Sequence, residues 1–441
     1  MLRTLILLAF LVSHLGAQSH PEPLELHRVE ASYQPPYYTT LYAPPAQPKE
    51  GELQIGVQYT LWIPPGLEKV RGIIVHQHGC GEGACLKSVT AAHDLHWQEL
   101  ARRTECALLG PSFRQRQEQD CKLWCDARNG SRDVFVESLE ILADKSGHPE
   151  IATAPWCLWG HSGGGWWASA MQLLDPNRIV AIWFQSGTAF SREDGFEMAD
   201  LPEGALDIPM IANPGIEEKT HERFHTAWDA SLAMTQAYRE RNAPIAFTPD
   251  PKSGHQTGDS RYLAIPFFEA CLELRLPKKP GNPLRRIDPN SGWLTPILSD
   301  DAPRPSSGYA GKATQANWLP TEAVAKAWRE FVTTGTVSDT TPPPAPTNVA
   351  FDPITGRLTW QADIDYESGL RAFIIQRDGK TIGRFPENPA NPWGRPLLQG
   401  MSYGDTPERL LAFEFIDTDP LYTKEREYRV IAVNSAGVKS D

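Results

Sequence analysis

The sequence predicts an α/β fold, with a mostly parallel sheet and helices on both faces, followed by a C-terminal all-β sandwich. Strand and helix patterns alternate from about Gln54 to Phe268, which is typical of a parallel sheet. The strand segments are continuous apolar runs, as expected for strands that are buried on both faces. A proline run at 342–346 separates this part from a region of short strand-like segments. With 441 residues, the chain is also too long for one ordinary domain.

Apolar runs and helical spacing locate the elements of the α/β part. The expected strands are 72–76, 106–109, 156–159, 179–184, 208–212 and 245–247. The strand at 106–109 should be closed by Gly110 and Pro111, which commonly mark turns. The expected helices are about Val89 to Arg103, Asp133 to Lys145, and Tyr262 to Leu274.

The regular pattern ends between Leu276 and Trp318, where Pro, Gly, Arg and Asp dominate. We expect an irregular excursion at 276–318 that returns in a short helix from Thr321 to Val332. The expected organisation is a signal peptide at 1–17, an α/β domain at 18–338, a Pro-rich linker at 339–346 and a β-module at 347–441.

The N-terminus has the pattern of a secretory signal peptide. Arg3 precedes an apolar run from Leu5 to Val12, and the small residues Gly16 and Ala17 follow. The run is too short to span a bilayer, and no Cys follows it that could carry a lipid anchor. A buried N-terminal helix is the alternative. We expect a secreted or periplasmic protein without a membrane segment after signal removal.

The charge balance argues against polyanionic partners. Lys and Arg total 42 against 54 Asp and Glu, a formal net charge of −12. Nucleic acids and anionic membranes require a basic face, so we expect neither as a partner. This charge balance is compatible with a neutral substrate.

Seven cysteines follow the signal segment, and export makes disulfides plausible. Cys80 with Cys85 and Cys121 with Cys125 are locally spaced pairs, but spacing alone leaves the connectivity open. The odd count leaves at least one Cys free or bonded to another chain. No CxxC pair occurs, so we expect no zinc site.

The segment Gly160-His161-Ser162-Gly163-Gly164-Gly165 contains the pattern Gly-x-Ser-x-Gly. It directly follows an apolar strand and precedes a segment that can start a helix, the context of a strained strand-to-helix turn that exposes a serine nucleophile. The helix N-terminus offers N–H groups to a developing oxyanion. An ordinary Gly-rich turn or a phosphate loop is the alternative, but no Lys-Ser/Thr pair follows.

A serine nucleophile needs a base, and His255 fits that role best. It lies in a loop after the strand at 245–247, the strand end where open α/β sheets place ligands. A surface-loop histidine is the alternative reading, and His221 and His225, in an expected helix, are weaker candidates for the base.

The base needs a carboxylate to hold its tautomer. Glu217 and Glu218 follow the strand at 208–212, after the serine and before the histidine, as a Ser–acid–His order requires. We choose Glu218, which stands third after Gly215, with Glu217 as the alternative. An acidic helix start exposed to solvent is the other reading of this pair.

Backbone N–H groups should form an oxyanion hole. We expect Gly163 to supply one donor, and Cys80 or Gly79, after the strand at 72–76, to supply the other. Metal binding by His76, His78 and Cys80 is the alternative, because His76 and His78 would share one strand face.

Residues from about Gln54 to Leu276 resemble the α/β-hydrolase superfamily, because the His78-Gly79 loop, the Gly160–Gly164 elbow and His255 occur in its order. The resemblance implies a nucleophile at Ser162, a base at His255 and oxyanion donors at Gly163 with Cys80 or Gly79. The chain offers Glu where the family more often has Asp, and the 276–318 excursion lies outside the minimal fold.

The C-terminal part resembles a fibronectin type III module, an immunoglobulin-like sandwich. Leu358-Thr359-Trp360 carries an expected core Trp, 372–377 reads as a strand, and Tyr428 to Gly437 matches a penultimate strand with its turn. The chain stops at Asp441, so the last strand would be unusually short. Such modules usually bind a ligand or hold neighbouring domains apart, and they rarely catalyse a reaction.

The sequence therefore predicts an exported serine hydrolase that cleaves a carboxylic ester through an acyl-enzyme. We expect a small-molecule or polymeric ester as substrate, contact with a surface or polymer through the C-terminal module, and no cofactor. The alternatives are a serine exopeptidase and a non-catalytic, hydrolase-like binding or adhesion protein.

Overall fold

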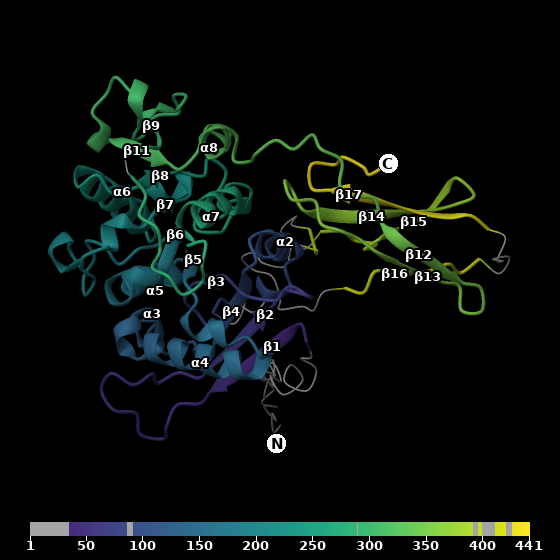
Figure 1. Ribbon diagram of the computed structural model, residues 1–441, viewed down its shortest axis with the longest axis horizontal. Helices are drawn as coiled ribbons and strands as arrows, with labels where there is room; N and C mark the ends of the chain where they lie inside the picture. Colours follow the sequence, from purple (N-terminus) through teal and green to yellow (C-terminus); the bar gives the residue numbers. More distant parts are fainter. Residues whose placement is uncertain (1–34, 86–90, 289, 391–395, 399–410, 420–425) are drawn as a thin grey trace, which may run out of the picture. The chain divides into compact units, whose positions relative to one another are not determined.

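An eight-stranded sheet forms the centre of the α/β part (Figure 1). The computed structural model describes residues 35–85, 91–288, 290–390, 396–398, 411–419 and 426–441, so the expected signal peptide lies outside the described residues. The strands are β1 (Tyr37–Tyr42), β2 (Val57–Trp62), β3 (Ile73–Gln77), β4 (Ala107–Phe113), β5 (Trp156–His161), β6 (Ile179–Gln185), β7 (Met210–Asn213) and β8 (Ile245–Phe247).

The strand order is β1-β2-β4-β3-β5-β6-β7-β8. β1, β2 and β4 pair antiparallel, whereas every pairing from β4 through β3 to β8 is parallel. The carboxyl ends of β3, β5, β7 and β8 therefore lie along one edge of the sheet, where α/β sheets place their ligands. The predicted mostly parallel sheet of the α/β part is confirmed.

Helices cover both faces of this sheet (Figure 1). They are α2 (Leu95–Arg103), α3 (Lys122–Cys125), α4 (Ser131–Ser146), α5 (Gly163–Leu174), α6 (His225–Glu240), α7 (Arg261–Arg275) and α8 (Glu322–Thr334). One apolar core joins the sheet to α4, α5 and α6, and a second joins it to α2, α7 and α8. No helix in the described ranges has the length and apolar character needed to cross a membrane.

Strand β4 is longer than the sequence predicts. It continues through Gly110 and Pro111 to Phe113, so the expectation that these two residues close the strand is wrong. Its parallel pairing with β3 covers only Ala107 to Leu109, and its antiparallel pairing with β2 extends to Phe113. Pro111 therefore lies beyond the pairing with β3, where a strand tolerates the missing N–H of proline.

The 276–318 excursion contains a small antiparallel sheet that the sequence did not predict. Its strands are β9 (Trp293–Pro296), β10 (Arg304–Pro305) and β11 (Ala316–Leu319), in the order β10-β9-β11. Leu294 and Trp318 are buried between them. Strands of two to four residues are too short to produce a recognisable alternation of polar and apolar residues.

The C-terminal part contains two three-stranded antiparallel sheets, as the predicted all-β sandwich requires. One sheet has the order β12 (Thr347–Asp352), β13 (Arg357–Gln361), β16 (Glu414–Ile416), and the other β15 (Lys380–Phe385), β14 (Leu370–Arg377), β17 (Tyr428–Asn434). Trp360 is 5% exposed, and its ring centroid lies 5.3 Å from that of Phe373 on the other sheet. An isolated antiparallel bridge joins Val433, within β17, to Lys439.

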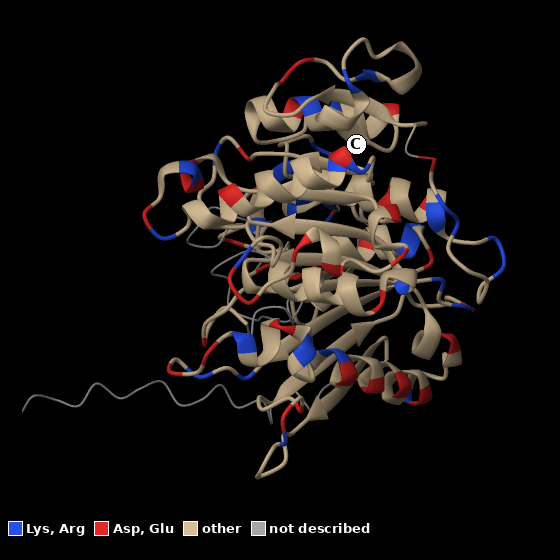
Figure 2. Cartoon of the chain, turned by 90° about the vertical axis from the view of Figure 1, so that its left-hand side faces the viewer, with Lys and Arg blue, Asp and Glu red and all other residues tan. Residues whose placement is uncertain are grey.

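Charged residues of both signs are interspersed on the α/β face shown in Figure 2. No extended region of one sign is visible on that face. This mixed surface offers no long basic track for a polyanion.

Candidate active site

Ser162 occupies a strained turn between β5 and α5. Its backbone has φ 54° and ψ −115°, a conformation that residues with a side chain rarely adopt. The Ser162 N–H donates to the Gln185 carbonyl at 2.8 Å, and the Ser162 carbonyl accepts from the N–H groups of Gly165 and Trp166 at 2.9 and 3.1 Å. Strand and helix thus hold the strained residue from both sides, as a nucleophile elbow requires.

Close backbone packing explains the glycines that flank Ser162. A Cβ on Gly160 would collide with the Gly164 carbonyl oxygen, and a Cβ on Gly164 would collide with the Gln77 carbonyl oxygen. The end of β3, the end of β5 and the start of α5 therefore approach more closely than side chains permit. The Gly-x-Ser-x-Gly pattern reflects this crowding.

His255 lies beside Ser162, as predicted. Its Nε2 is 2.8 Å from Ser162 Oγ, a distance at which the hydroxyl can donate to the imidazole. The loop that carries His255 is tied to the elbow, because His161 Nε2 lies 2.9 Å from the His255 carbonyl oxygen. His161 and His255 are 94 positions apart in the sequence, so this contact holds the loop of His255 against the end of β5.

Glu218 lies on the other side of the histidine. Its Oε1 is 2.5 Å from His255 Nδ1, its side chain is fully buried, and its Oε2 accepts the Gly215 N–H at 3.1 Å. Glu217 is exposed and points toward Gly254 instead. The structure thus brings Ser162, His255 and Glu218 together and leaves Glu217 outside the chain of hydrogen bonds.

Backbone pairing beyond β7 and β8 explains why the acid and the histidine meet. The loop after β7 forms a one-turn 3₁₀ helix, Ile216–Thr220, whose first N–H donates to the Asp250 carbonyl at 2.8 Å. The Glu217 N–H donates to the Ser253 carbonyl at 3.2 Å, and Gly215 forms a bridge with Asp250. The two loops are therefore joined along their length before their side chains interact.

Burial shifts the pKa values of both members of this pair. It raises the pKa of Glu218, although the Gly215 N–H that donates to the carboxylate offsets part of this effect. Burial also lowers the pKa of His255, and the nearby Arg223 and His221 lower it further. Burial therefore favours a neutral imidazole, the form that can accept the Ser162 proton.

The predicted oxyanion donors converge on Ser162 from the end of β3. A Cβ on Gly79 would lie 2.8 Å from Ser162 Cβ, and a Cβ on Gly163 would lie 3.3 Å from the Cys80 backbone nitrogen. Gly163 is also the first residue of α5, so its N–H belongs to the positive end of a helix. Gly79, Cys80 and Gly163 therefore lie close together beside Ser162.

The alternative reading of a metal site at His76, His78 and Cys80 finds no support. Two groups among the described residues could hold a metal ion, Cys80 with Cys121 and Cys125, and Asp339 with Asp365 and Glu367, and neither includes a histidine. The His76 ring instead packs with ring centroids 4.2 Å from Trp97 and 5.6 Å from Trp159. Cys80 is bonded to Cys121, so neither sulfur is available as a thiolate ligand.

Phe224 is a site residue that the sequence did not reveal. Its ring stacks on His255 with centroids 3.8 Å apart and an interplanar angle of 4°, and Arg223 Cζ lies 5.0 Å from the centroid of the Phe224 ring. The weaker base candidates lie nearby without joining the triad: His221 precedes α6 with its ring 4.8 Å from Phe224, and His225 starts the helix. No sequence signal distinguishes Phe224 from other aromatic residues.

We predict that Phe224→Leu lowers kcat for an ester substrate by about two- to tenfold, because a stacked aromatic pair contributes about 0.5–1.5 kcal/mol. The stacked ring limits the orientations of His255, so its loss should change kcat more than KM. Steady-state kinetics on a soluble aryl ester would measure this effect. Phe224→Tyr keeps the stacking and should stay within twofold of the wild type, and an equal loss in both variants would contradict the stacking role.

Comparison with known proteins adds distant likenesses. No protein-family model matches the chain, and no curated protein matches it. Among solved structures, the chain is similar to poly(aspartic acid) hydrolase-1 from Sphingomonas sp. KT-1, with 14% identity, a TM-score of 0.36 and coverage of 51% of this chain and 94% of that one. It is also similar to a ferulic acid esterase, with 15% identity, a TM-score of 0.35 and coverage of 50% and 91%. A third similar structure is an S-formylglutathione hydrolase from Agrobacterium tumefaciens, with 12% identity, a TM-score of 0.33 and coverage of 55% and 95%.

Proposed function

We propose that this protein is a serine hydrolase that cleaves a carboxylic ester through an acyl-enzyme. The observation that carries the proposal is the chain of hydrogen-bond distances from Ser162 Oγ through His255 to Glu218, set in a strained strand-to-helix turn. A serine, a histidine and a buried carboxylate in this order have the roles of nucleophile, base and orienting acid.

In the first half of the reaction, Ser162 Oγ attacks the ester carbonyl carbon while His255 Nε2 takes the hydroxyl proton. The carbonyl oxygen becomes an oxyanion that the N–H groups of Gly163 and of Cys80 or Gly79 stabilise. His255 then gives its proton to the leaving alcohol, and the acyl group stays on Ser162. Glu218 holds the Nδ1–H tautomer and stabilises the imidazolium that forms.

In the second half, a water molecule takes the place of the alcohol. His255 accepts a proton from this water as it attacks the acyl carbon, and then returns the proton to Ser162 Oγ as the acid product leaves. The chemistry of all steps is contained in these side chains and backbone groups, so we propose that the reaction uses no cofactor.

Hydrolysis tests separate the two alternative functions from this one. A serine exopeptidase would hydrolyse an aminoacyl anilide faster than a short-chain aryl ester such as p-nitrophenyl acetate, and a binding protein would turn over neither. We expect ester hydrolysis to be the faster reaction and to require Ser162. Anilide cleavage that exceeds ester cleavage would favour the exopeptidase.

We further propose that the protein is exported, with residues 1–17 as its signal peptide. The N-terminal pattern of Arg3 followed by an apolar run supports this proposal. The disulfide between Cys80 and Cys121 also supports it, because such bonds persist in the periplasm and outside the cell.

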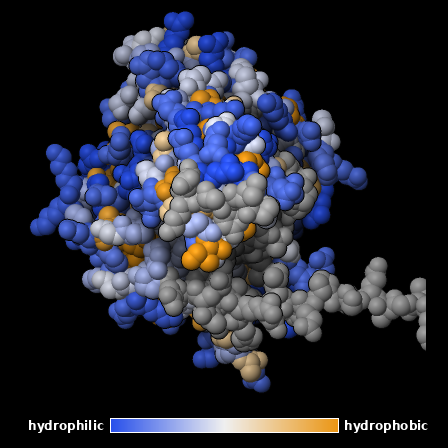
Figure 3. Space-filling view, turned by 90° about the vertical axis from the view of Figure 1, so that its right-hand side faces the viewer, coloured by the Kyte–Doolittle hydropathy of each residue, from blue (hydrophilic) through white to orange (hydrophobic). Residues whose placement is uncertain are grey.

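We also propose that the C-terminal module is a fibronectin type III-like unit that contacts a polymer carrying the ester. A groove of about 350 Å³ on its β15-β14-β17 sheet supports this, because Arg371, Arg384 and Lys439 line it and no acidic residue does. None of these three cations has an ion pair with the residues that the structure describes. Figure 3 shows hydrophilic residues over much of this side of the molecule, together with an apolar cluster beside the grey atoms.

We predict that the triple variant Arg371→Ala, Arg384→Ala, Lys439→Ala leaves kcat/KM for p-nitrophenyl acetate within twofold, but weakens binding to a polycarboxylate such as polygalacturonate. A weak second contact raises the local concentration at a polymer without lowering the chemical barrier. Co-sedimentation with the cross-linked polymer at low salt would measure binding. Arg357→Ala is the control, because Arg357 is paired with Glu414 on the other sheet and should not contribute. Equal binding by the triple variant and the wild type would refute the groove as the contact.

A further inference from the structure

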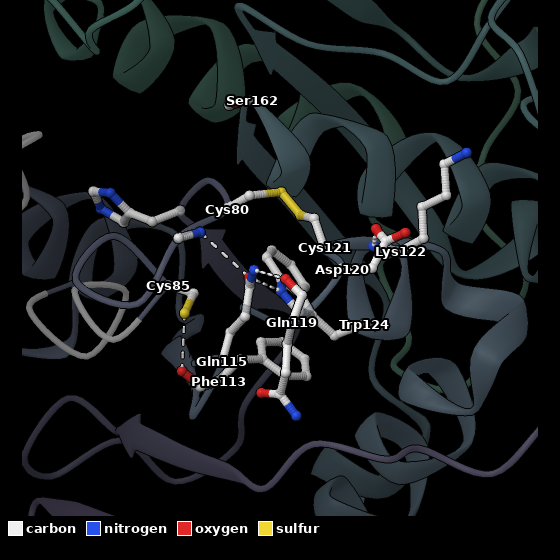
Figure 4. The surroundings of a disulfide bond; sticks show 12 residues. Cys80, Cys85, Phe113, Gln115, Gln119, Asp120, Cys121, Lys122, Trp124 and Ser162 are labelled. Carbon is white, nitrogen blue, oxygen red and sulfur yellow. Dashed lines mark hydrogen bonds between the residues drawn. A yellow bond between two sulfur atoms is a disulfide. The ribbon is translucent and has the colours of Figure 1, made fainter. Parts of the chain in front are cut away.

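A single disulfide lies against the nucleophile elbow (Figure 4). Cys80 follows β3 and is bonded to Cys121, the residue before α3, across 41 positions of sequence. A Cβ on Gly163 would collide with Cys80 Sγ, so the disulfide touches the first residue of α5, next to Ser162. The bond therefore links the loop after β3, with its candidate oxyanion donor, to a separate segment of the fold.

Among the described residues, backbone hydrogen bonds within this loop begin only after the donor, where the Ala84 and Cys85 N–H groups donate to the Gly81 carbonyl at 3.1 Å. It contains Gly79, Gly81 and Gly83, and Gly81 has φ +110°, a conformation that favours glycine. Each glycine enlarges the set of conformations open to the chain, which raises the entropic cost of holding one N–H in place. The Cys80 N–H has no acceptor in the part of the chain that the structure describes, so it remains available to a substrate oxygen.

Two side-chain anchors hold the loop close to Cys80, and the Cys85 thiol, which donates to the Phe113 carbonyl at 3.0 Å, holds its far end. The first is the disulfide to Cys121, and the second is Gln115, whose Oε1 accepts the Gly81 N–H at 3.3 Å and the Trp124 Nε1–H at 2.8 Å (Figure 4). Trp124 is fully buried and stacks on Phe113 at the end of β4, with ring centroids 4.6 Å apart. Both anchors thus connect the loop to α3 and, through Trp124, to the central sheet.

We propose that Cys121, through its disulfide to Cys80, and Gln115 are positioning residues for the Cys80 N–H, the second oxyanion donor, so that full activity requires the oxidised disulfide. The inference rests on the proposed serine hydrolase function and adds a redox requirement to that site. Removing one oxyanion donor costs serine hydrolases about 10²–10³-fold in kcat. An untethered donor should cost a large part of that factor.

A reductant can break this disulfide selectively. The other five cysteines are free, so a reductant acts on this bond alone. A dithiol reductant supplies two electrons and two protons, breaks the S–S bond to leave thiols at Cys80 and Cys121, and closes to its own cyclic disulfide. Both bonded cysteines are partly exposed, which gives the reductant access.

A third sulfur provides a matched control. Cys125 Sγ lies within 4.8 Å of both bonded sulfurs, but burial raises the pKa of the Cys125 thiol and keeps it protonated. A protonated thiol does not attack a disulfide, so the pairing of Cys80 with Cys121 is kept at neutral pH. A Cys125→Ala variant removes a sulfur from the same cluster without breaking the bond.

The test compares the full-length wild type with Cys121→Ala and Cys125→Ala. We expect Cys121→Ala to lower kcat on p-nitrophenyl acetate by about 30- to 300-fold with KM within threefold, and to slow phosphonylation of Ser162 by a fluorophosphonate in parallel. Cys125→Ala should keep kcat within threefold. Dithiothreitol should lower the wild-type kcat as far as Cys121→Ala does, reoxidation should restore it, and Cys121→Ala should not respond to the reductant.

Two further measurements distinguish a loss of activity caused by a displaced donor from a loss caused by unfolding. Thermal unfolding and circular dichroism identify any loss that comes from an unfolded variant, and the reduced wild type replaces Cys121→Ala if that variant does not fold. A folded, reduced wild type with unchanged kcat and unchanged phosphonylation rate would overturn the inference. An oxidised wild type that neither hydrolyses esters nor reacts with the fluorophosphonate would instead contradict the proposed function.

Discussion

Ser162→Ala is expected to abolish ester hydrolysis, lowering kcat by about 10⁴- to 10⁶-fold, because it removes the atom that forms the acyl-enzyme. The fold should survive the change. Position 162 has a positive φ in the wild type, and alanine carries the same Cβ as serine, so the substitution adds no backbone strain. Steady-state kinetics on p-nitrophenyl acetate, with thermal unfolding as the check on the fold, would measure the loss.

Ser253→Ala is the matched control for this variant. Ser253 is buried in the loop that carries His255, and its hydroxyl has no hydrogen-bond partner among the described residues. Its removal should leave kcat within threefold of the wild type. Activity of Ser162→Ala within tenfold of the wild type would refute the assignment of the nucleophile.

Glu218→Gln is the second variant with a large expected effect, a fall in kcat of about 10⁴-fold. Glu218 Oε1 lies 2.5 Å from His255 Nδ1, so a carboxylate there selects the tautomer whose Nε2 can accept the Ser162 proton. An amide can donate to Nδ1 instead, which places the imidazole proton on Nε2, where it blocks proton transfer. The loss should appear in kcat, with KM little changed.

Glu217→Gln is the control for Glu218→Gln, because the two residues are adjacent and have the same side chain. Glu217 is exposed and lies outside the chain of hydrogen bonds, so its change should cost less than threefold. A larger loss in Glu217→Gln than in Glu218→Gln would exchange their roles. No loss in either variant would place the acid elsewhere in the chain.

The sequence predicted the strands of the sheet well where long apolar runs mark them. The strand at 245–247 agrees with β8, and the runs at 156–159 and 179–184 lie within β5 and β6. The helix expected from Val89 begins at Leu95, with residues 86–90 outside the described ranges. Local patterns failed where distant pairing decides the structure, as in β4, which continues through Pro111 because β2 extends its ladder.

The site was predictable to the level of the motif and its order along the chain. The choice between Glu217 and Glu218 depends on the direction that each side chain takes in a 3₁₀ turn, and no sequence periodicity sets this. The spacing of the cysteines left their connectivity open. The disulfide joins Cys80 to Cys121, because the loop after β3 and the start of α3 meet beside the elbow.

The residues around the histidine were beyond sequence analysis for the same reason. Phe224 stacks on His255, and His161 lies within hydrogen-bond distance of the His255 carbonyl oxygen, although 31 and 94 positions separate each pair. Each contact depends on how the loops after β7 and β8 turn back over the elbow. Contacts such as those of Phe224 and His161 with His255 can be identified only from the three-dimensional structure, because nothing in the sequence distinguishes these residues from others of the same type.

The most direct test of the central claim is to react the purified wild type with a fluorophosphonate and map the modified residue by mass spectrometry. The reagent forms a bond to a serine only where a base activates the hydroxyl and an oxyanion hole receives the phosphoryl oxygen. We predict one stoichiometric modification, at Ser162, that His255→Ala slows by at least about 10³-fold and that Ser162→Ala abolishes. Modification at another serine, or labelling of Ser162 that does not depend on His255, would contradict it.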